Sequence, residues 1–176
     1  MPGVQTCALP ICAAVDRNQH YLLGADFGTD SVRVVIVDAF DGNVVLSQAE
    51  TYSRWADGTY CDPIHNQFRQ HPLDYIESFR KAVRTLTSTD AYVASHIRAI
   101  GVDTTGSTCA LCFANGSPLA LDSRFTNDPD AMFFLWKDHT AVGEAEQINR
   151  AFSAWNGPDY RIYSGTLYSS EWYWAK

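Results

Sequence analysis

Three apolar segments follow one another at short spacing near the start of the chain, and they constrain the fold more than any other feature. They are residues 21–25 (YLLGA), 32–37 (VRVVIV) and 44–49 (VVLSQA). The first two are almost continuous apolar runs, as expected for strands buried on both faces. Asp41-Gly42 precedes the third segment, and Asp-Gly is typical of tight turns because both residues tolerate positive φ. The sequence therefore predicts a three-stranded antiparallel meander.

A helix is predicted to begin at His71-Pro72, after a polar, aromatic-rich loop over residues 54–70. Proline suits the first helical position, and the carboxylate of Asp74 suits the first turn because of the helix dipole. The following apolar residues recur at three- and four-residue steps and predict one buried face: Leu73, Ile76, Phe79, Val83 and Leu86.

The second half of the chain predicts one more strand, one hairpin and a second helix. The strand covers residues 97–102, and the hairpin joins residues 109–113 to 118–121 around Asn115-Gly116. The second helix covers residues 138–152, with an inward face formed by Val142, Ala145, Ile148 and Phe152. Together these elements predict an α/β fold, in which helices pack on one mixed, twisted sheet.

Length and charge limit the class of protein. The 176 residues suffice for one compact domain, and 46% hydrophobic with 19% charged residues is an ordinary globular composition. The net charge is −7 and Lys and Arg are not clustered, which argues against nucleic acid and anionic membranes as partners. No apolar stretch is long enough to span a bilayer.

Both ends of the chain are interpreted separately from the fold. Residues 1–18 contain GVQTCALPI, which resembles a translated sequencing adapter, so we expect an artefactual, disordered leader and the fold proper over residues 19–176. At the other end, Ser169 or Ser170 can cap a short helix. Only about one turn follows, and Trp172 and Trp174 are expected to have little to pack against, which indicates a truncated domain.

The five cysteines allow two interpretations. Cys109 and Cys112 form a CxxC pair that resembles half of a metal or redox site, but no second pair completes it. Reduced cysteines packed as small apolar side chains are the favoured interpretation, which implies a cytoplasmic protein.

The first candidate site is the connection between the first two strands, residues 26–31 (DFGTDS). Gly28 lets the backbone turn tightly and approach a ligand without a Cβ in the way. Successive amides of the turn can converge on phosphate oxygens, and the hydroxyls of Thr29 and Ser31 can add donors. Asp26, at the carboxyl end of its strand, is placed to hold Mg²⁺. A plain hairpin turn explains the same residues, and this stretch alone favours neither interpretation.

A second connection repeats this pattern. Residues 100–108 (IGVDTTGST) form a strand that ends in Asp103, followed by hydroxyl residues and Gly106. Ligands of α/β sheets bind beyond the carboxyl ends of strands, so Asp26 and Asp103 are expected to line one cleft. Ordinary turn hydroxyls are the alternative for at least two of the Thr and Ser residues.

A third candidate is the segment LWKDHTA, residues 135–141. The structural interpretation is that Asp138 or Thr140 is the N-cap of the helix that follows. The functional interpretation is an aromatic wall with polar groups for a hydroxylated ligand, formed by Trp136, Lys137 and His139. No carboxylate or nucleophile stands at a meaningful spacing from His139, which argues against a catalytic base there.

Several of these stretches resemble the N-terminal part of the ribulose-phosphorylating branch of the FGGY carbohydrate kinase family. They are DFGTDSVR, CDPIHNQFRQHPLDYIES, IGVDTTGST, NDPDAMFFLWKDHTA and GTLYSSEWYWAK, and the resemblance runs from about Tyr21 to Lys176. It implies the ribonuclease-H-like lobe of the actin/hexokinase-like ATPases. It also implies ATP and Mg²⁺ as cofactors and phosphorylation of L-ribulose or a related pentulose, as in L-arabinose breakdown.

The resemblance assigns site residues in two groups. ATP phosphates and Mg²⁺ are assigned to Asp26, Gly28, Thr29, Asp30 and Ser31, with Asp26 at the metal. The sugar is assigned to Asp103, Thr105, Gly106, Ser107, Trp136, Lys137 and His139. The catalytic base and the adenosine-binding lobe of the family lie beyond the stretches that match, so we expect this chain alone to be inactive. A non-catalytic sugar- or nucleotide-binding module and another actin-like ATPase stay open as alternatives, and so does a homo-oligomeric full-length enzyme.

Overall fold

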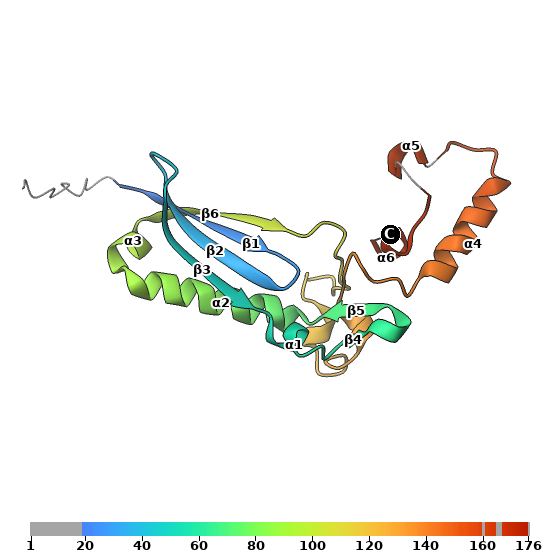
Figure 1. Ribbon diagram of the computed structural model, residues 1–176, viewed down its shortest axis with the longest axis horizontal. Helices are drawn as coiled ribbons and strands as arrows, with labels where there is room; N and C mark the ends of the chain where they lie inside the picture. Colours follow the sequence, from blue (N-terminus) through green and yellow to red (C-terminus); the bar gives the residue numbers. More distant parts are fainter. Residues whose placement is uncertain (1–18, 160, 165–166, 176) are drawn as a thin grey trace, which may run out of the picture.

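The computed structural model describes residues 19–159, 161–164 and 167–175. The leader predicted over residues 1–18 lies outside this range. The main sheet has four strands, and Figure 1 shows them side by side: β1 (Tyr21–Phe27), β2 (Ser31–Asp38), β3 (Val44–Thr51) and β6 (Ile97–Thr104). Their order is β3-β2-β1-β6, with β1, β2 and β3 antiparallel and β6 parallel to β1. The predicted meander and mixed sheet are confirmed.

One long helix, α2 (Pro72–Thr89), covers one face of this sheet (Figure 1). Its residues that pack most tightly recur every four positions: Asp74, Ser78, Ala82 and Leu86. Ala82 and Leu86 belong to one core with the strand residues Leu23, Val32, Val34 and Ile36. The helix was predicted correctly, but of the expected apolar face only Leu86 lies in the buried strip, Phe79 and Val83 are partly buried beside it, and Ile76 is exposed. The reason is that small side chains bring a helix closer to a sheet than large ones do.

The opposite face of the sheet carries no described helix (Figure 1). Leu22 of β1 is exposed on this face. Strand β6 is more open still, because seven of its eight residues are exposed, with Ile100 at 61% and Val102 at 67%. On its outer edge β6 has no neighbouring strand among the described residues.

The predicted loop over residues 54–70 is wrong, since this stretch contains four short elements. They are α1 (Ser53–Ala56), β4 (Cys61–Asp62), η1 (Pro63–His65) and β5 (Gln67–Gln70). Strand β7 (Phe133–Phe134) joins them to give a small sheet in the order β4-β5-β7. Elements of two to four residues have no period that a sequence pattern can reveal, and tertiary contacts form them.

The segment after β6 departs from the predicted hairpin. Gly116 does turn the chain with a φ of 82°, but Cys112 and Pro118 form only an isolated bridge. The second half of the predicted hairpin is the 3-10 helix η2 (Leu119–Leu121), and a further one, η3 (Pro129–Ala131), precedes β7. Helix α3 (Ala91–Ser95) connects α2 to β6.

Three helices complete the described chain: α4 (Val142–Ser153), α5 (Arg161–Ser164) and α6 (Ser170–Ala175). They lie beyond the small sheet, at the end opposite to α3 (Figure 1). Helix α4 begins four residues later than predicted, and of its expected inward face Ala145 is buried whereas Val142 is 44% exposed. No helix in the described part of the chain is long and apolar enough to cross a membrane.

The prediction that the last two tryptophans lack packing partners is wrong. Ser169 accepts a hydrogen bond from the Trp172 N–H (3.2 Å), which caps α6. The Trp174 ring stacks on Phe134 with 4.2 Å between centroids, and its indole N–H donates to Thr140 (3.2 Å). The helix is short, but tertiary contacts hold it.

Candidate functional site

The turn between β1 and β2 is closed by one backbone hydrogen bond, from the Gly28 N–H to the Ser31 carbonyl (3.0 Å). Gly28 does not adopt positive φ, and a Cβ at this position would meet its nearest atom at an ordinary 3.4 Å. The fold itself therefore does not require glycine here. Among the described residues, the N–H groups of Thr29 and Asp30 have no backbone partner, so these amides and not that of Gly28 are free for a ligand.

Contacts from distant parts of the chain hold this turn in place. The Gln70 side-chain amide donates to the Thr29 carbonyl (2.6 Å), and the Tyr52 N–H donates to the Asp30 carbonyl (3.1 Å). The Trp55 indole N–H donates to the Asp30 carboxylate (2.6 Å). A turn anchored from three sides keeps its remaining donors in fixed directions, as an anion site needs.

Two carboxylates lie next to the turn on the uncovered face of the sheet. Asp26 of β1 and Asp103 of β6 are direct partners in the parallel strand pair. Both line one open pocket of about 380 Å³, together with Arg33. Gly24 and Gly101, also direct partners, line the same pocket and leave its floor close to the backbone. The sequence prediction that the two aspartates share a cleft agrees with this placement.

Arg33 is a charged pocket residue that the sequence reasoning missed. It is the antiparallel partner of Asp26, because the β1–β2 turn pairs Phe27 with Val32 and the next pair outward is Asp26 with Arg33. If strand pairs are counted outward from a two-residue turn at Thr29 and Asp30, the sequence alone predicts that Arg33 lies opposite Asp26. Arg33 supplies a fixed positive charge beside the two carboxylates, in a chain with a net charge of −7.

The second predicted connection lies against the first. The Thr105 N–H donates to the Phe27 carbonyl (3.2 Å), and the Thr105 hydroxyl donates to that of Thr108 (3.1 Å). Ser107 has a φ of 58°, a left-handed conformation that non-glycine residues seldom adopt and that is often found at functional sites. Gly106 has no such φ, and a Cβ there would meet no atom within 4 Å. The fold itself therefore does not require glycine at position 106.

The structure brings one of the three predicted wall residues close to the first turn. The Lys137 ammonium lies 4.6 Å from the centroid of the Trp55 ring and 4.8 Å from that of Phe68. Trp136 is 49% exposed, and His139 is exposed with its N–H bonded to the Asn66 carbonyl (3.0 Å). Lys137 thus reaches Asp30 through Trp55, whereas no described contact joins Trp136 or His139 to the turn.

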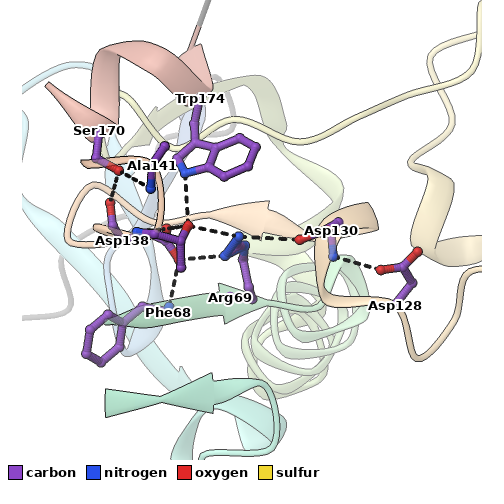
Figure 2. A network of polar contacts seen from close by, with 9 residues as sticks. Phe68, Arg69, Asp128, Asp130, Asp138, Ala141, Ser170 and Trp174 are labelled. Carbon is purple, nitrogen blue, oxygen red and sulfur yellow. Dashed lines mark hydrogen bonds and ion pairs between the residues drawn. The ribbon is translucent and has the colours of Figure 1, made fainter. Parts of the chain in front are cut away.

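Asp138 is not the helix cap that the sequence suggested. It is fully buried and accepts hydrogen bonds from Arg69 (2.6 Å) and from the Phe68 N–H (2.8 Å), as Figure 2 shows. The Arg69 guanidinium lies 3.9 Å from the centre of the Phe134 ring. Burial lowers the pKa of Arg69, and the charge of Asp138 opposes that shift. Ser170 links this network to α6, because its hydroxyl donates to the Asp138 carbonyl (3.1 Å) and accepts from the Ala141 N–H (3.0 Å).

The cysteines do not form a metal site in the described part of the chain. Cys61, Cys109 and Cys112 are all free thiols, and no group of three or more His, Cys, Asp or Glu residues there could hold a metal ion. Burial raises the pKa of the Cys61 and Cys109 thiols, as expected for cysteines that pack as apolar side chains.

Comparison with known proteins identifies relatives of the chain. No family model matches it. The ribulokinase of Vibrio parahaemolyticus is 46% identical over 163 residues, which are 92% of this chain and 29% of that protein. The ribulokinase of Shouchella clausii is 32% identical over 166 residues, 90% of this chain and 29% of that protein. The chain thus spans less than a third of the length of these relatives.

Solved structures with the same fold are sugar kinases. A xylulose kinase from Brucella ovis superimposes with a TM-score of 0.66 at 20% identity, over 86% of this chain and 27% of that protein. A gluconate kinase from Lactobacillus acidophilus gives 0.54 at 17% identity, over 77% and 22%. The expected actin/hexokinase-like fold is confirmed for the part that the chain spans. The chain is therefore similar over nearly its whole length to ribulokinases and fits an N-terminal part of them, and its structural neighbours are sugar kinases of the FGGY type.

Proposed function

We propose that the chain supplies the first phosphate-binding turn and one wall of the sugar site of a kinase. The reaction is transfer of the ATP γ-phosphoryl group to a hydroxyl of L-ribulose or a related pentulose. One observation carries the proposal: the pair Asp26 and Asp103 lies in one open pocket, directly beside an anchored turn that has two free amides. The names of the relatives support the substrate class.

On the phosphate side, the residues present fit a nucleotide with its magnesium ion. The amides of Thr29 and Asp30 and the hydroxyls of Thr29 and Ser31 donate to phosphate oxygens. Asp26 offers carboxylate oxygens, the ligands that Mg²⁺ prefers, and Arg33 lies beside it to bind a phosphate oxygen. The bound ion neutralises the negative charge of the phosphates.

On the sugar side, we assign Asp103, Thr105, Gly106 and Ser107 to the ligand. The Asp103 carboxylate accepts from the Thr104 N–H (2.9 Å), which fixes its orientation toward a ligand hydroxyl. The open space beside Gly106 leaves room for the sugar. Trp136, Lys137 and His139 are assigned to the wall of the sugar site.

We assign no catalytic base to this chain. The chain spans 29% of the length of the ribulokinases it matches, and we place the base and the adenosine-binding lobe in the remainder of such a protein. The role of the described residues is then to bind and orient the phosphates and the sugar, so that the reacting oxygen and phosphorus lie close together.

Ligand binding by the ¹⁵N-labelled 176-residue chain tests this function. Titration with Mg²⁺–ATP should shift the amide signals of Thr29 and Asp30, and Asp26→Asn should weaken the Mg²⁺-dependent part of binding about tenfold or more. Asp41→Asn, at the β2–β3 turn, is the matched control and should bind normally. Titration with L-ribulose should shift the signals of Thr105 and Ser107, and Gly106→Leu should abolish this without lowering stability. Unchanged spectra in both titrations would refute the proposal.

A further inference from the structure

Trp55 of α1 contacts charged groups of both proposed half-sites with one indole ring. Its N–H donates to the Asp30 carboxylate at 2.6 Å, and its ring face lies 4.6 Å from the Lys137 ammonium. Asp30 belongs to the turn assigned to phosphate and Lys137 to the wall assigned to the sugar. These two residues are far apart in the sequence, and Trp55 joins them.

The position of Trp55 is fixed from beneath by a buried carboxylate of α2. Asp74 has no exposed side-chain surface, and it accepts the backbone N–H groups of Trp55 (3.1 Å) and Arg54 (3.2 Å) and the Arg54 guanidinium (3.0 Å). Asp74 thereby holds the first turn of α1 against α2. The Trp55 side chain is itself partly buried against the core of the main sheet, so its place does not depend on a ligand.

The contact with Asp30 has a consequence for phosphate binding. A carboxylate in a turn that binds phosphate repels the ligand unless it is held aside, and at about 4 Å in water this repulsion amounts to roughly 1 kcal/mol. The indole N–H takes one carboxylate oxygen at 2.6 Å and so restricts the directions in which the charge can point. Without that donor, the exposed Asp30 side chain is free to turn toward the phosphates.

We propose that Trp55 is a positioning residue of the kinase. Its N–H keeps the Asp30 carboxylate away from the phosphates, and its ring face keeps the Lys137 ammonium, between Trp55 and Phe68, at the sugar wall. The proposal rests on the proposed function, because it assigns a role within that same site. The two roles use different parts of the indole and can be separated by substitution.

Trp55→Phe removes the N–H and keeps a ring, whereas Trp55→Leu removes both. With Mg²⁺–tripolyphosphate as the probe, Trp55→Phe in the 176-residue chain should raise the Kd about fivefold, the factor equivalent to about 1 kcal/mol. The double variant Asp30→Asn/Trp55→Phe should bind as Asp30→Asn does, because no charge is left to misplace. With L-ribulose as the probe, Trp55→Leu should raise the Kd about threefold relative to Trp55→Phe, the range of an exposed cation–π contact.

The indole N–H resonance of Trp55 provides a readout without any ligand. It should shift in Asp30→Asn and stay in place in the control Asp103→Asn. Normal Mg²⁺–tripolyphosphate binding by Trp55→Phe, or a double variant that binds this probe less tightly than Asp30→Asn, would overturn the role of Trp55 and leave the proposed function intact. Failure of the unsubstituted chain to bind either probe would overturn the proposed function itself, and with it this role, even if the indole resonance behaves as expected.

Discussion

At the scale of single residues, the ion pair of Arg69 and Asp138 offers a direct test of the packing between the small sheet and α6. Its two side chains are 1% and 0% exposed, and removal of Asp138 leaves the buried Arg69 charge with only the exposed Asp130 carboxylate, at 3.5 Å, as an ionic partner. We expect Asp138→Ala to lower the free energy of unfolding by about 3–5 kcal/mol, measured by urea denaturation. Glu146→Ala is the control, because its ion pair with Arg150 is exposed and should contribute less than about 1 kcal/mol. Equal losses for the two variants would contradict this account.

The buried His71 is expected to make the free energy of unfolding fall at acidic pH. It is buried at the start of α2, where its ring nitrogen accepts the Leu73 N–H (3.1 Å). Burial, aided by the positive charge of Arg54, lowers the pKa of His71 below the ordinary 6.5. The unfolded chain therefore binds the proton more readily than the folded one, so this stabilisation is complete above pH 6.5 and declines as the pH falls below it.

Urea denaturation between pH 8 and pH 5 measures this effect. His71→Asn keeps a side-chain acceptor at the cap and should flatten the decline in stability. His65→Asn changes a histidine whose side chain is 76% exposed and should leave the decline in place. A decline of equal size in His71→Asn would show that other groups cause it.

At the scale of elements, the sequence predicted what depends on periodicity and missed what depends on tertiary contacts. Apolar runs predicted the three strands of the meander and β6, and apolar residues at three- and four-residue steps predicted α2. All of these elements are present. The predicted start of α4 lies before the observed one because Asp138 resembles an N-cap in the sequence. In the structure, the Asp138 carboxylate instead binds Arg69, 69 positions earlier in the chain. A sequence pattern carries no information about such a distant partner.

In the candidate site too, some residues could be predicted from the sequence and others depend on tertiary contacts. The neighbouring positions of Asp26 and Asp103 could be anticipated, because both end strands of one α/β sheet. Trp55 could not, since its role depends on a short helix that Asp74 holds from another element. The role assigned to Gly28 also changed, because its amide closes the turn and the free donors are those of the next two residues.

The exposed edge strand β6 is expected to pair with a second copy of the chain. It is an exposed edge strand with Ile100 at 61% and Val102 at 67% exposure, and such edges pair with other chains. We expect the 176-residue chain to self-associate, and we expect Ile100→Lys to weaken association about tenfold or more, since burial of an isoleucine contributes roughly 1.5–3 kcal/mol. Sedimentation equilibrium measures the change. Ile64→Lys, at a residue that is 87% exposed on η1, is the control. Equal association of the two variants would exclude β6 as the contact.

At the scale of the whole molecule, the described residues cover one face of the main sheet and leave the face with the Asp26–Asp103 pocket open. Catalysis of phosphoryl transfer needs both substrates held in line and water excluded, and orientation alone can contribute roughly 7–11 kcal/mol to lowering the barrier. An open pocket can bind phosphate and sugar groups but cannot enclose them. Binding and turnover should therefore be separable in this chain.

We accordingly expect the purified 176-residue chain to bind Mg²⁺–ATP weakly and to show no sugar-dependent turnover above about 1 s⁻¹, the low end for ordinary enzymes. ADP release with L-ribulose, ATP and Mg²⁺ is the measurement, with the Vibrio parahaemolyticus ribulokinase in the same assay as the positive control. Weak binding without turnover would show that this chain lacks the positioning of the two substrates, because the turn and the aspartate proposed to bind phosphate and Mg²⁺ are present. Turnover that rises with the square of the chain concentration would instead mean that a second copy completes the site, and turnover in proportion to concentration would show that the open pocket suffices.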